Sequence, residues 1–184
     1  MASVLVPLAP GCEELEAVTV VDLLRRAGIE VVTAGLAVGP VTASRGVVLV
    51  PDTTLDEALG REFDMVVLPG GMPGADHLDK DPRVRELLHK MADSGRFTAA
   101  ICAAPKVLGN AGLLTGKRAT SFPGFVDKMA LPDVTYLEET VVHDGKVITS
   151  RGPGTAMDFA LHLIEILADK VTRDEVESKL ERPC

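Results

Sequence analysis

Hydrophobic positions in this chain fall into two patterns that alternate along its length. Short runs that are apolar on both faces predict buried β-strands. Longer segments with apolar residues every three or four positions predict helices that bury one face. The expected strands cover residues 4–9, 29–34, 65–68 and 97–101, and the expected helices cover 12–27, 55–59, 82–94, 153–168 and 173–180.

Turn residues separate these elements at the expected places. Gly28 is positioned to end the first helix. Residues 41–50 contain two short β runs around Ser44-Arg45-Gly46, and the Asp144-Gly145 pair between residues 139–142 and 147–149 indicates a hairpin. Strands that alternate with helices predict an α/β fold, a doubly wound and mostly parallel sheet with helices on both faces. No linker, repeat or low-complexity segment interrupts residues 1–184, so we expect a single domain.

Composition and charge narrow the possible functions. The chain has 184 residues, of which 46% are hydrophobic and 25% charged, which is typical of a globular protein. A net charge of −8 without a basic cluster argues against nucleic-acid binding. No apolar stretch is long enough to span a bilayer, and residues 1–9 lack the basic start of a secretory signal. The cysteines Cys12, Cys102 and Cys184 fit neither a disulfide framework nor a zinc pattern, which favours the reducing cytoplasm.

The segment around Cys102 is the strongest candidate for chemistry. The apolar run of residues 97–101 ends at this cysteine, and Pro105 is suited to the first turn of a following helix. Cys102 is therefore expected at a strand-to-helix turn, where helix N–H groups and the helix dipole favour the thiolate and lower its pKa. A buried, inert cysteine is an equally good interpretation of the position alone.

Two further loops follow predicted strands and should meet the Cys102 turn, because ligands bind beyond the carboxyl ends of parallel strands. These loops are residues 10–14 and the Pro69-Gly70-Gly71 turn. Glycine has no Cβ, so the N–H groups of Gly70 and Gly71 can approach a sulfur or an oxyanion closely. No Gly-Lys-Ser/Thr follows them, so the loop is not a phosphate-binding P-loop.

Acidic residues open the first predicted helix. Glu16 shares a helical stripe with apolar positions, and a carboxyl held in such surroundings has a raised pKa. Glu13 shares a stripe of the same kind, so periodicity does not choose between them, and surface placement beside the helix dipole suits at least two of Glu13, Glu14 and Glu16.

Other polar residues give weaker signals. No histidine is adjacent to Cys102, and no His, Cys and carboxylate cluster has metal-ligand spacing, so no metal or cofactor is expected. Arg151 precedes a predicted helix, where it either binds an anion or is simply solvated.

Six segments, in order, resemble the ThiJ/PfpI superfamily over nearly the whole chain, most closely the branch of Parkinson disease protein seven and bacterial YajL. These segments are residues 8–16, 22–29, 44–46, 66–71, 100–105 and 149–155. The resemblance implies a flavodoxin-like fold and a homodimer, with Arg26 near the interface. It also implies that Cys102 is the reactive cysteine and that Glu16 is the acid that hydrogen-bonds its sulfur.

The resemblance assigns further roles around the cysteine. The backbone of Gly70, Gly71 and Ala103 is expected near the sulfur, and Arg45 and Arg151 are expected to flank the pocket. Related members are described as glutathione-independent glyoxalases, as deglycases and as redox-responsive chaperones. The implied substrates are α-oxoaldehydes or glycated proteins, and the alternative is a non-enzymatic redox sensor that works through oxidation of Cys102.

This chain departs from parts of the family pattern. Family proteases carry histidine directly after the cysteine, where this chain has Ala103, so peptidase activity is not expected. The animal branch has a histidine near the pocket where this chain has Phe122, which leaves Glu16 to transfer protons. Cys12 stands where relatives often carry alanine or serine, which places a second thiol near the pocket loop.

Overall fold

The computed structural model describes residues 1–182, in which seven strands form one central sheet. The strand order is β10-β11-β7-β6-β1-β2-β5, and every neighbouring pair is parallel except β10 and β11. The strands are β1 (Ser3–Leu8), β2 (Glu30–Gly35), β5 (Thr53–Thr54), β6 (Met65–Leu68), β7 (Phe97–Ile101), β10 (Val141–Asp144) and β11 (Val147–Ser150). This arrangement confirms the predicted doubly wound, mostly parallel α/β fold.

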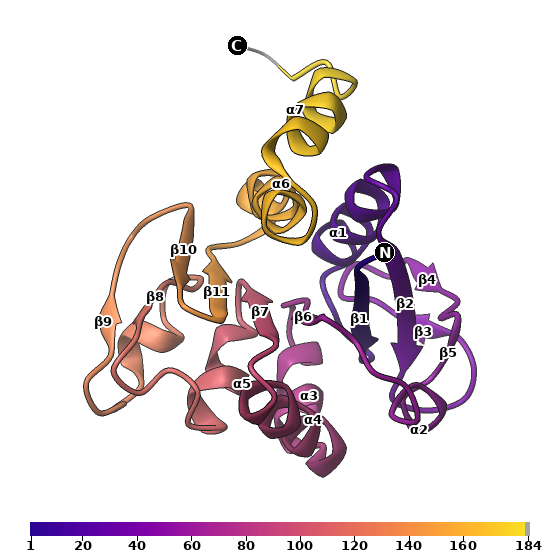
Figure 1. Ribbon diagram of the computed structural model, residues 1–184. Helices are drawn as coiled ribbons and strands as arrows, with labels where there is room; N and C mark the ends of the chain where they lie inside the picture. The colour runs from indigo at the N-terminus through magenta and orange to yellow at the C-terminus, as the bar shows by residue number, and fades with distance from the viewer. Residues whose placement is uncertain (183–184) are drawn as a thin grey trace.

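Helices cover both faces of this sheet, α1, α6 and α7 on one side and α2 to α5 on the other (Figure 1). Successive residues of β1 alternate between the two cores: Val4 and Val6 face α1 and α6, and Leu5 faces the opposite layer. The helices are α1 (Glu14–Arg26), α2 (Leu55–Ala58), α3 (Gly74–Lys80), α4 (Pro82–Asp93), α5 (Pro105–Asn110), α6 (Ala156–Leu167) and α7 (Lys170–Ser178).

The winding of the chain determines where a site can form. From β1 the chain moves outward to β2, and it then returns to β6 on the other side of β1. The loops after β1 and β6 therefore leave neighbouring strands in opposite directions. A crevice forms at such a reversal, and this is where ligands bind in open α/β sheets. The end of β7 lies beside β6, which brings the Cys102 turn to the same edge.

Several local predictions are confirmed and a few elements were missed. Gly28 follows α1 with a φ of +75°, and the 41–50 segment forms the antiparallel pair β3 (Val41–Thr42) and β4 (Val48–Leu49). The first helix begins at Glu14, two residues later than expected. Helix α3 and the two-residue strands β5, β8 (Arg118–Ala119) and β9 (Thr135–Tyr136) were not predicted. Short 3-10 turns span Val126–Lys128 and Pro153–Thr155, the second at the start of the expected 153–168 helix.

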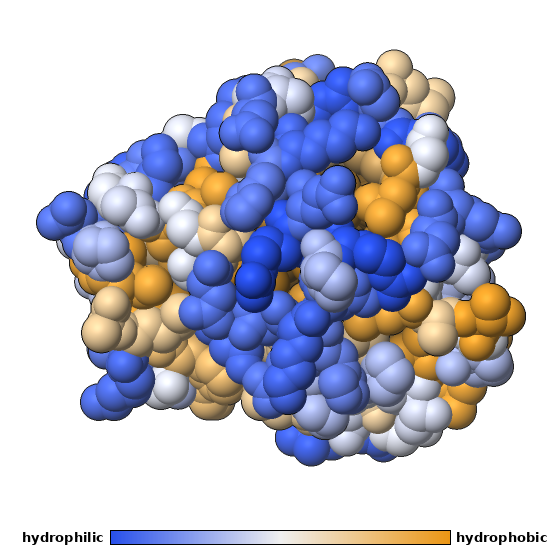
Figure 2. All heavy atoms as spheres, turned by 90° about the horizontal axis from the view of Figure 1, so that it is seen from below, coloured by the Kyte–Doolittle hydropathy of each residue, from blue (hydrophilic) through white to orange (hydrophobic). Residues whose placement is uncertain are grey.

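The surface carries no broad apolar band on the face seen in Figure 2, where hydrophilic residues dominate and hydrophobic ones gather in separate patches. Among residues 1–182, no helix is both long and apolar enough to cross a membrane.

Candidate active site

Cys102 lies on a strained elbow directly after β7. Its φ is +64°, a left-handed conformation that is unfavourable for residues other than glycine by about 1–2 kcal/mol. Two backbone hydrogen bonds hold this conformation. The Cys102 N–H donates to the Ser150 carbonyl at 3.0 Å, and its own carbonyl accepts the Phe122 N–H at 2.8 Å. Pro105 begins α5 as predicted, so the elbow places the sulfur between a strand end and a helix start.

Glu16 is the carboxyl that the fold brings to this elbow. It lies in the first turn of α1 and is fully buried, with 0% of its surface exposed. The Gly70 N–H donates to Glu16 Oε2 at 2.8 Å, whereas the buried Oε1 makes no hydrogen bond of good geometry within residues 1–182. A buried carboxyl with one unpaired oxygen favours the neutral, protonated form, because the anion is more costly to bury. The structure therefore chooses Glu16 among the three acids.

Burial controls the protonation of both groups. It raises the pKa of Glu16 to about 7, and the nearby charge of Glu13 adds to this, while the Gly70 N–H and the Cys102 side chain act in the opposite direction. Burial also raises the pKa of the Cys102 thiol to about 12, with ionised Glu16 as the second cause. The lowered pKa expected for Cys102 is therefore wrong, because burial outweighs the N–H groups of Gly71 and Ala103. The pair instead holds a thiol beside a carboxyl that titrates near neutral pH.

The three predicted loops meet at this point, as expected. A Cβ on Gly70 would lie 2.6 Å from the Cys102 Cβ, and one on Gly71 would lie 2.3 Å from the Glu13 nitrogen. Only glycine permits this packing. The N–H groups of Gly71 and Ala103 approach the Cys102 sulfur and favour its anion. The Gly70 N–H was expected to approach the sulfur or an oxyanion of the substrate, but it donates to the Glu16 carboxyl.

A cavity of about 350 Å³ opens in front of the sulfur. It is lined by Glu13, Ser44, Arg45, Gly71, Met72, Cys102, Ala103, Phe122, Phe125 and Pro153. Arg45 flanks this cavity as predicted. Arg151 is not among the lining residues, and its guanidinium lies 3.8 Å from the Glu138 carboxylate. Met72, Phe122, Phe125 and Pro153 give the lining an apolar part, and Phe122 occupies the position where the resemblance to the animal branch implied a histidine.

Glu13, which periodicity left as an alternative to Glu16, also lines the cavity. It precedes α1, so the helical stripe that seemed to make it equivalent to Glu16 does not apply to it. The Ser44 hydroxyl lies 2.9 Å from Glu13 Oε2 and 3.0 Å from Glu14 Oε2. Glu14 does not line the cavity, and it accepts the Arg45 N–H at 2.9 Å, so it holds the β3–β4 turn in place.

The histidines and Cys12, which the sequence also offered as candidates, do not line the cavity. His77 contacts the Pro10 carbonyl, and His143 and His162 contact each other at 3.2 Å, so none of these histidines reaches Cys102. Cys12 is fully buried, and burial raises the pKa of its thiol to about 11. Cys184 lies outside the described residues. Residues 1–182 hold no group of three or more His, Cys, Asp or Glu side chains placed to bind a metal ion.

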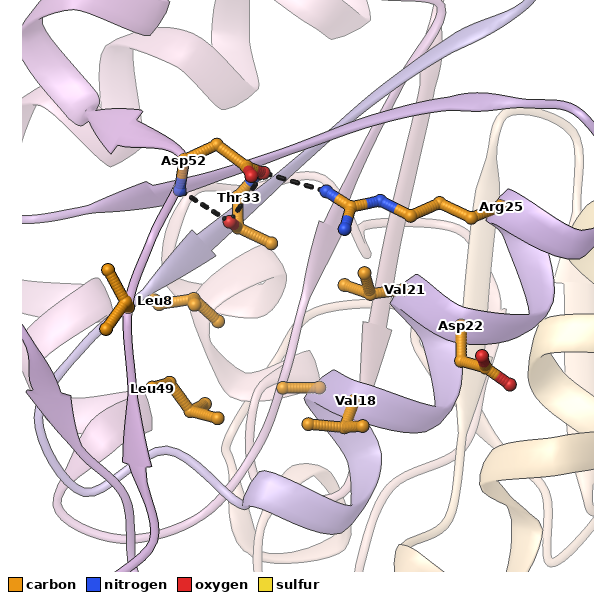
Figure 3. A pocket seen from close by; sticks show the side chains of 10 residues that line it. Leu8, Val18, Val21, Asp22, Arg25, Thr33, Leu49 and Asp52 are labelled. Atoms are coloured by element: carbon orange, nitrogen blue, oxygen red, sulfur yellow. Dashed lines mark hydrogen bonds and ion pairs between the residues drawn. The ribbon is translucent and has the colours of Figure 1, made fainter.

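A second hollow, of about 290 Å³, lies beside α1 (Figure 3). Val18, Val21 and Leu49 form its apolar side, and a polar cluster closes it where Arg25 and Thr33 both bond to Asp52 at 2.8 Å. It contains neither a thiol nor a buried acid, so it is not the candidate active site.

A strained elbow cysteine, a buried partner carboxyl and a flavodoxin-like sheet together define a class of cysteine-centred α/β proteins. The chain belongs to the DJ-1/PfpI family, whose model matches residues 2–166.

Similar proteins support this assignment. Drosophila melanogaster protein dj-1beta is 46% identical over 97% of this chain and 96% of its own length. The glutathione-independent glyoxalase DJR-1.2 of Caenorhabditis elegans is 40% identical over 90% of this chain and 88% of its own. Protein DJ-1 homolog A of Arabidopsis thaliana is 44% identical over 97% of this chain, which spans only 46% of that longer protein.

Solved structures agree with the fold. The crystal structure of Drosophila DJ-1beta matches with a TM-score of 0.95 and 44% identity, covering 100% of this chain and 99% of the other. The oxidized form of Toxoplasma gondii DJ-1 matches with a TM-score of 0.92 and 38% identity, covering 98% of each chain.

Proposed function

We propose that this protein is a glyoxalase that converts α-oxoaldehydes to hydroxy acids through Cys102, without glutathione. The observation that carries the proposal is the buried pairing of the Cys102 thiol with Glu16, whose pKa of about 7 suits proton transfer at neutral pH. The relative named as a glutathione-independent glyoxalase supports the same reaction class.

The first step joins the sulfur to the aldehyde carbon. The Glu16 carboxylate takes the thiol proton as Cys102 attacks, so a free thiolate is not needed beforehand. Glu16 then returns that proton to the new alkoxide, which gives a hemithioacetal and leaves Glu16 ionised.

The second step moves a proton between adjacent carbons. Glu16 removes the proton from the former aldehyde carbon and delivers it to the neighbouring carbonyl carbon, while the hydroxyl proton passes from the first oxygen to the second. The intermediate is an enediolate, whose negative charge is met by the N–H groups of Gly71 and Ala103. The product is a thioester on Cys102, and hydrolysis of that thioester releases the hydroxy acid.

The direct test is incubation of purified protein with methylglyoxal in the absence of glutathione. Wild type should form lactate, and the Cys102→Ser variant should form none above the uncatalysed background. Lactate formation that persists in Cys102→Ser would disprove the proposed reaction. The same thiol addition could act on glycated amines or thiols, and deglycation is tested by release of the free amine from a methylglyoxal adduct.

We also propose a homodimer that buries the hollow beside α1. Val18 is 49% exposed and Val50 is 78% exposed on its rim, and apolar side chains clustered beside a groove are typical of interfaces between subunits. A reducing compartment such as the cytoplasm suits the proposed chemistry, because Cys102 acts as a free thiol.

Redox sensing is the second candidate function. Cys102 is 9% exposed and opens into the cavity, whereas Cys12 is fully buried, so an oxidant reaches Cys102 first. A sulfinate there would be stabilised by the Gly71 and Ala103 N–H groups and by protonated Glu16. An activity, such as suppression of client aggregation, that appears only after oxidation and is lost in Cys102→Ser would favour this function over turnover.

A further inference from the structure

We propose that Glu13 is the general base that activates water to hydrolyse the Cys102 thioester. The inference rests on the proposed glyoxalase reaction and divides its proton transfers between two carboxylates. Glu16 transfers the protons of the substrate's carbon skeleton, and Glu13 takes a proton from the attacking water.

Hydrolysis requires a base that water can reach. Glu16 is poorly suited to this step, because it is fully buried and its Oε2 already accepts the Gly70 N–H at 2.8 Å. Glu13 is only partly buried, and it lines the same cavity as the Cys102 sulfur. Within the described cavity lining, it is the only carboxylate.

The position of Glu13 is well defined. Its N–H donates to the Gly70 carbonyl at 2.9 Å, and the Gly70–Gly71 turn separates it from Cys102. The Ser44 hydroxyl lies 2.9 Å from Glu13 Oε2 and orients the carboxylate. That hydroxyl has one proton to donate, and Glu14 also accepts the backbone N–H of Arg45. The Ser44 hydroxyl can therefore donate its proton to Glu13 and hold that carboxylate in position.

The hydrolytic step balances without any other reactant. The water oxygen bonds to the thioester carbonyl carbon as a water proton passes to the Glu13 carboxylate. The carbon–sulfur bond then breaks, and its electron pair leaves on the Cys102 sulfur, which the Gly71 and Ala103 N–H groups stabilise. The proton on Glu13 returns to the sulfur through the cavity water. Thiol and carboxylate are thereby restored.

The test is mass spectrometry of the intact protein during turnover of methylglyoxal. Glu13→Gln should accumulate a lactoyl group on Cys102, with thioester breakdown slowed about 100-fold relative to wild type. Ser44→Ala should accumulate the same adduct to a smaller extent. Glu86→Gln, a change at an exposed position on α4, is the matched control and should behave as wild type.

A chemical rescue separates a catalytic from a structural role. After free methylglyoxal is removed, hydroxylamine should release the lactoyl group from Glu13→Gln as the hydroxamate, because this nucleophile needs no general base. Glu13→Gln that turns over like wild type, or that is slowed before the adduct forms, would overturn the inference. Absence of lactate in wild type would instead refute the proposed function itself, so the two failures are distinguishable.

Discussion

The Gly70 N–H donates to Glu16 Oε2 at 2.8 Å, so the carboxyl and the glycine turn form one rigid unit behind the sulfur. A Cβ on Gly70 would lie 2.9 Å from the same oxygen and 2.6 Å from the Cys102 Cβ. The turn thus fixes how closely the acid and the nucleophile approach each other.

Gly70→Ala should consequently destabilise the protein and impair the site. The added methyl group has little room, because it would also lie 2.8 Å from the Ile101 carbonyl oxygen, and overpacking of this kind costs about 1–3 kcal/mol. Urea denaturation measures the loss. Gly154→Ala is the matched control, since its Cβ would meet nothing within 4 Å, and equal stability losses in the two variants would contradict the packing argument.

Glu16 should make stability depend on pH in a defined window. Its pKa is about 7 in the folded protein against an ordinary value of 4.5, so the folded state holds this proton more tightly. The stabilisation it provides is complete below about pH 4.5 and is lost as pH rises through about 7. Relative to wild type, Glu16→Gln should therefore gain about 3 kcal/mol of unfolding free energy between these limits.

Denaturant unfolding at several pH values measures this difference, with Glu86→Gln as a control whose difference from wild type stays constant. A Glu16→Gln difference that does not change with pH would show that the buried carboxyl has an ordinary pKa.

The thiol of Cys102 should ionise more easily when Glu16 loses its charge. The ionised carboxyl raises the pKa of Cys102, so Glu16→Gln should shift the pH profile of Cys102 alkylation to lower pH. Peptide-resolved mass spectrometry follows Cys102 separately from Cys12, which should react more slowly because it is fully buried. A shift to higher pH would mean that Glu16 acts on the sulfur chiefly as a proton donor.

The proposed dimer is tested by placing charge in the hollow beside α1. Val18→Glu and Val50→Glu should reduce the mass seen by light scattering from a dimer to a monomer, because an unpaired charge is unfavourable in a buried interface. Val38→Glu is the control, since Val38 is 90% exposed on a different part of the surface. A wild-type monomer at all concentrations would refute the dimer.

The sequence predicted those features that depend on local pattern. The β6 range, 65–68, was predicted correctly because four apolar residues are followed by Pro69-Gly70-Gly71. Two-residue strands such as β5 were missed because they contain no periodicity to detect. Helix α3 was missed because it starts at Gly74, a poor helix former, three residues after Gly71.

The site was predicted less completely, for a physical reason. Cys102 and the meeting of three loops follow from the topology. Periodicity could not choose Glu16 over Glu13, because that choice depends on where α1 begins, and only the family resemblance indicated Glu16. The pKa of Cys102 was expected to fall because N–H groups at a helix start can be recognised in the sequence. Burial of Cys102 by segments distant in the chain cannot be recognised from the local sequence, and here burial has the larger effect on the pKa of Cys102.

The central claim is that Glu16 transfers the protons for Cys102, and initial rates of lactate formation against pH test it most directly. With a chelator present and no glutathione, kcat/KM of wild type should rise as pH passes through about 7, because Glu16 must be ionised to take the thiol proton. Glu16→Gln should be slower by about 100-fold or more and should lose this inflection. A Glu16→Gln variant that keeps the wild-type rate and the wild-type pH profile would contradict the account.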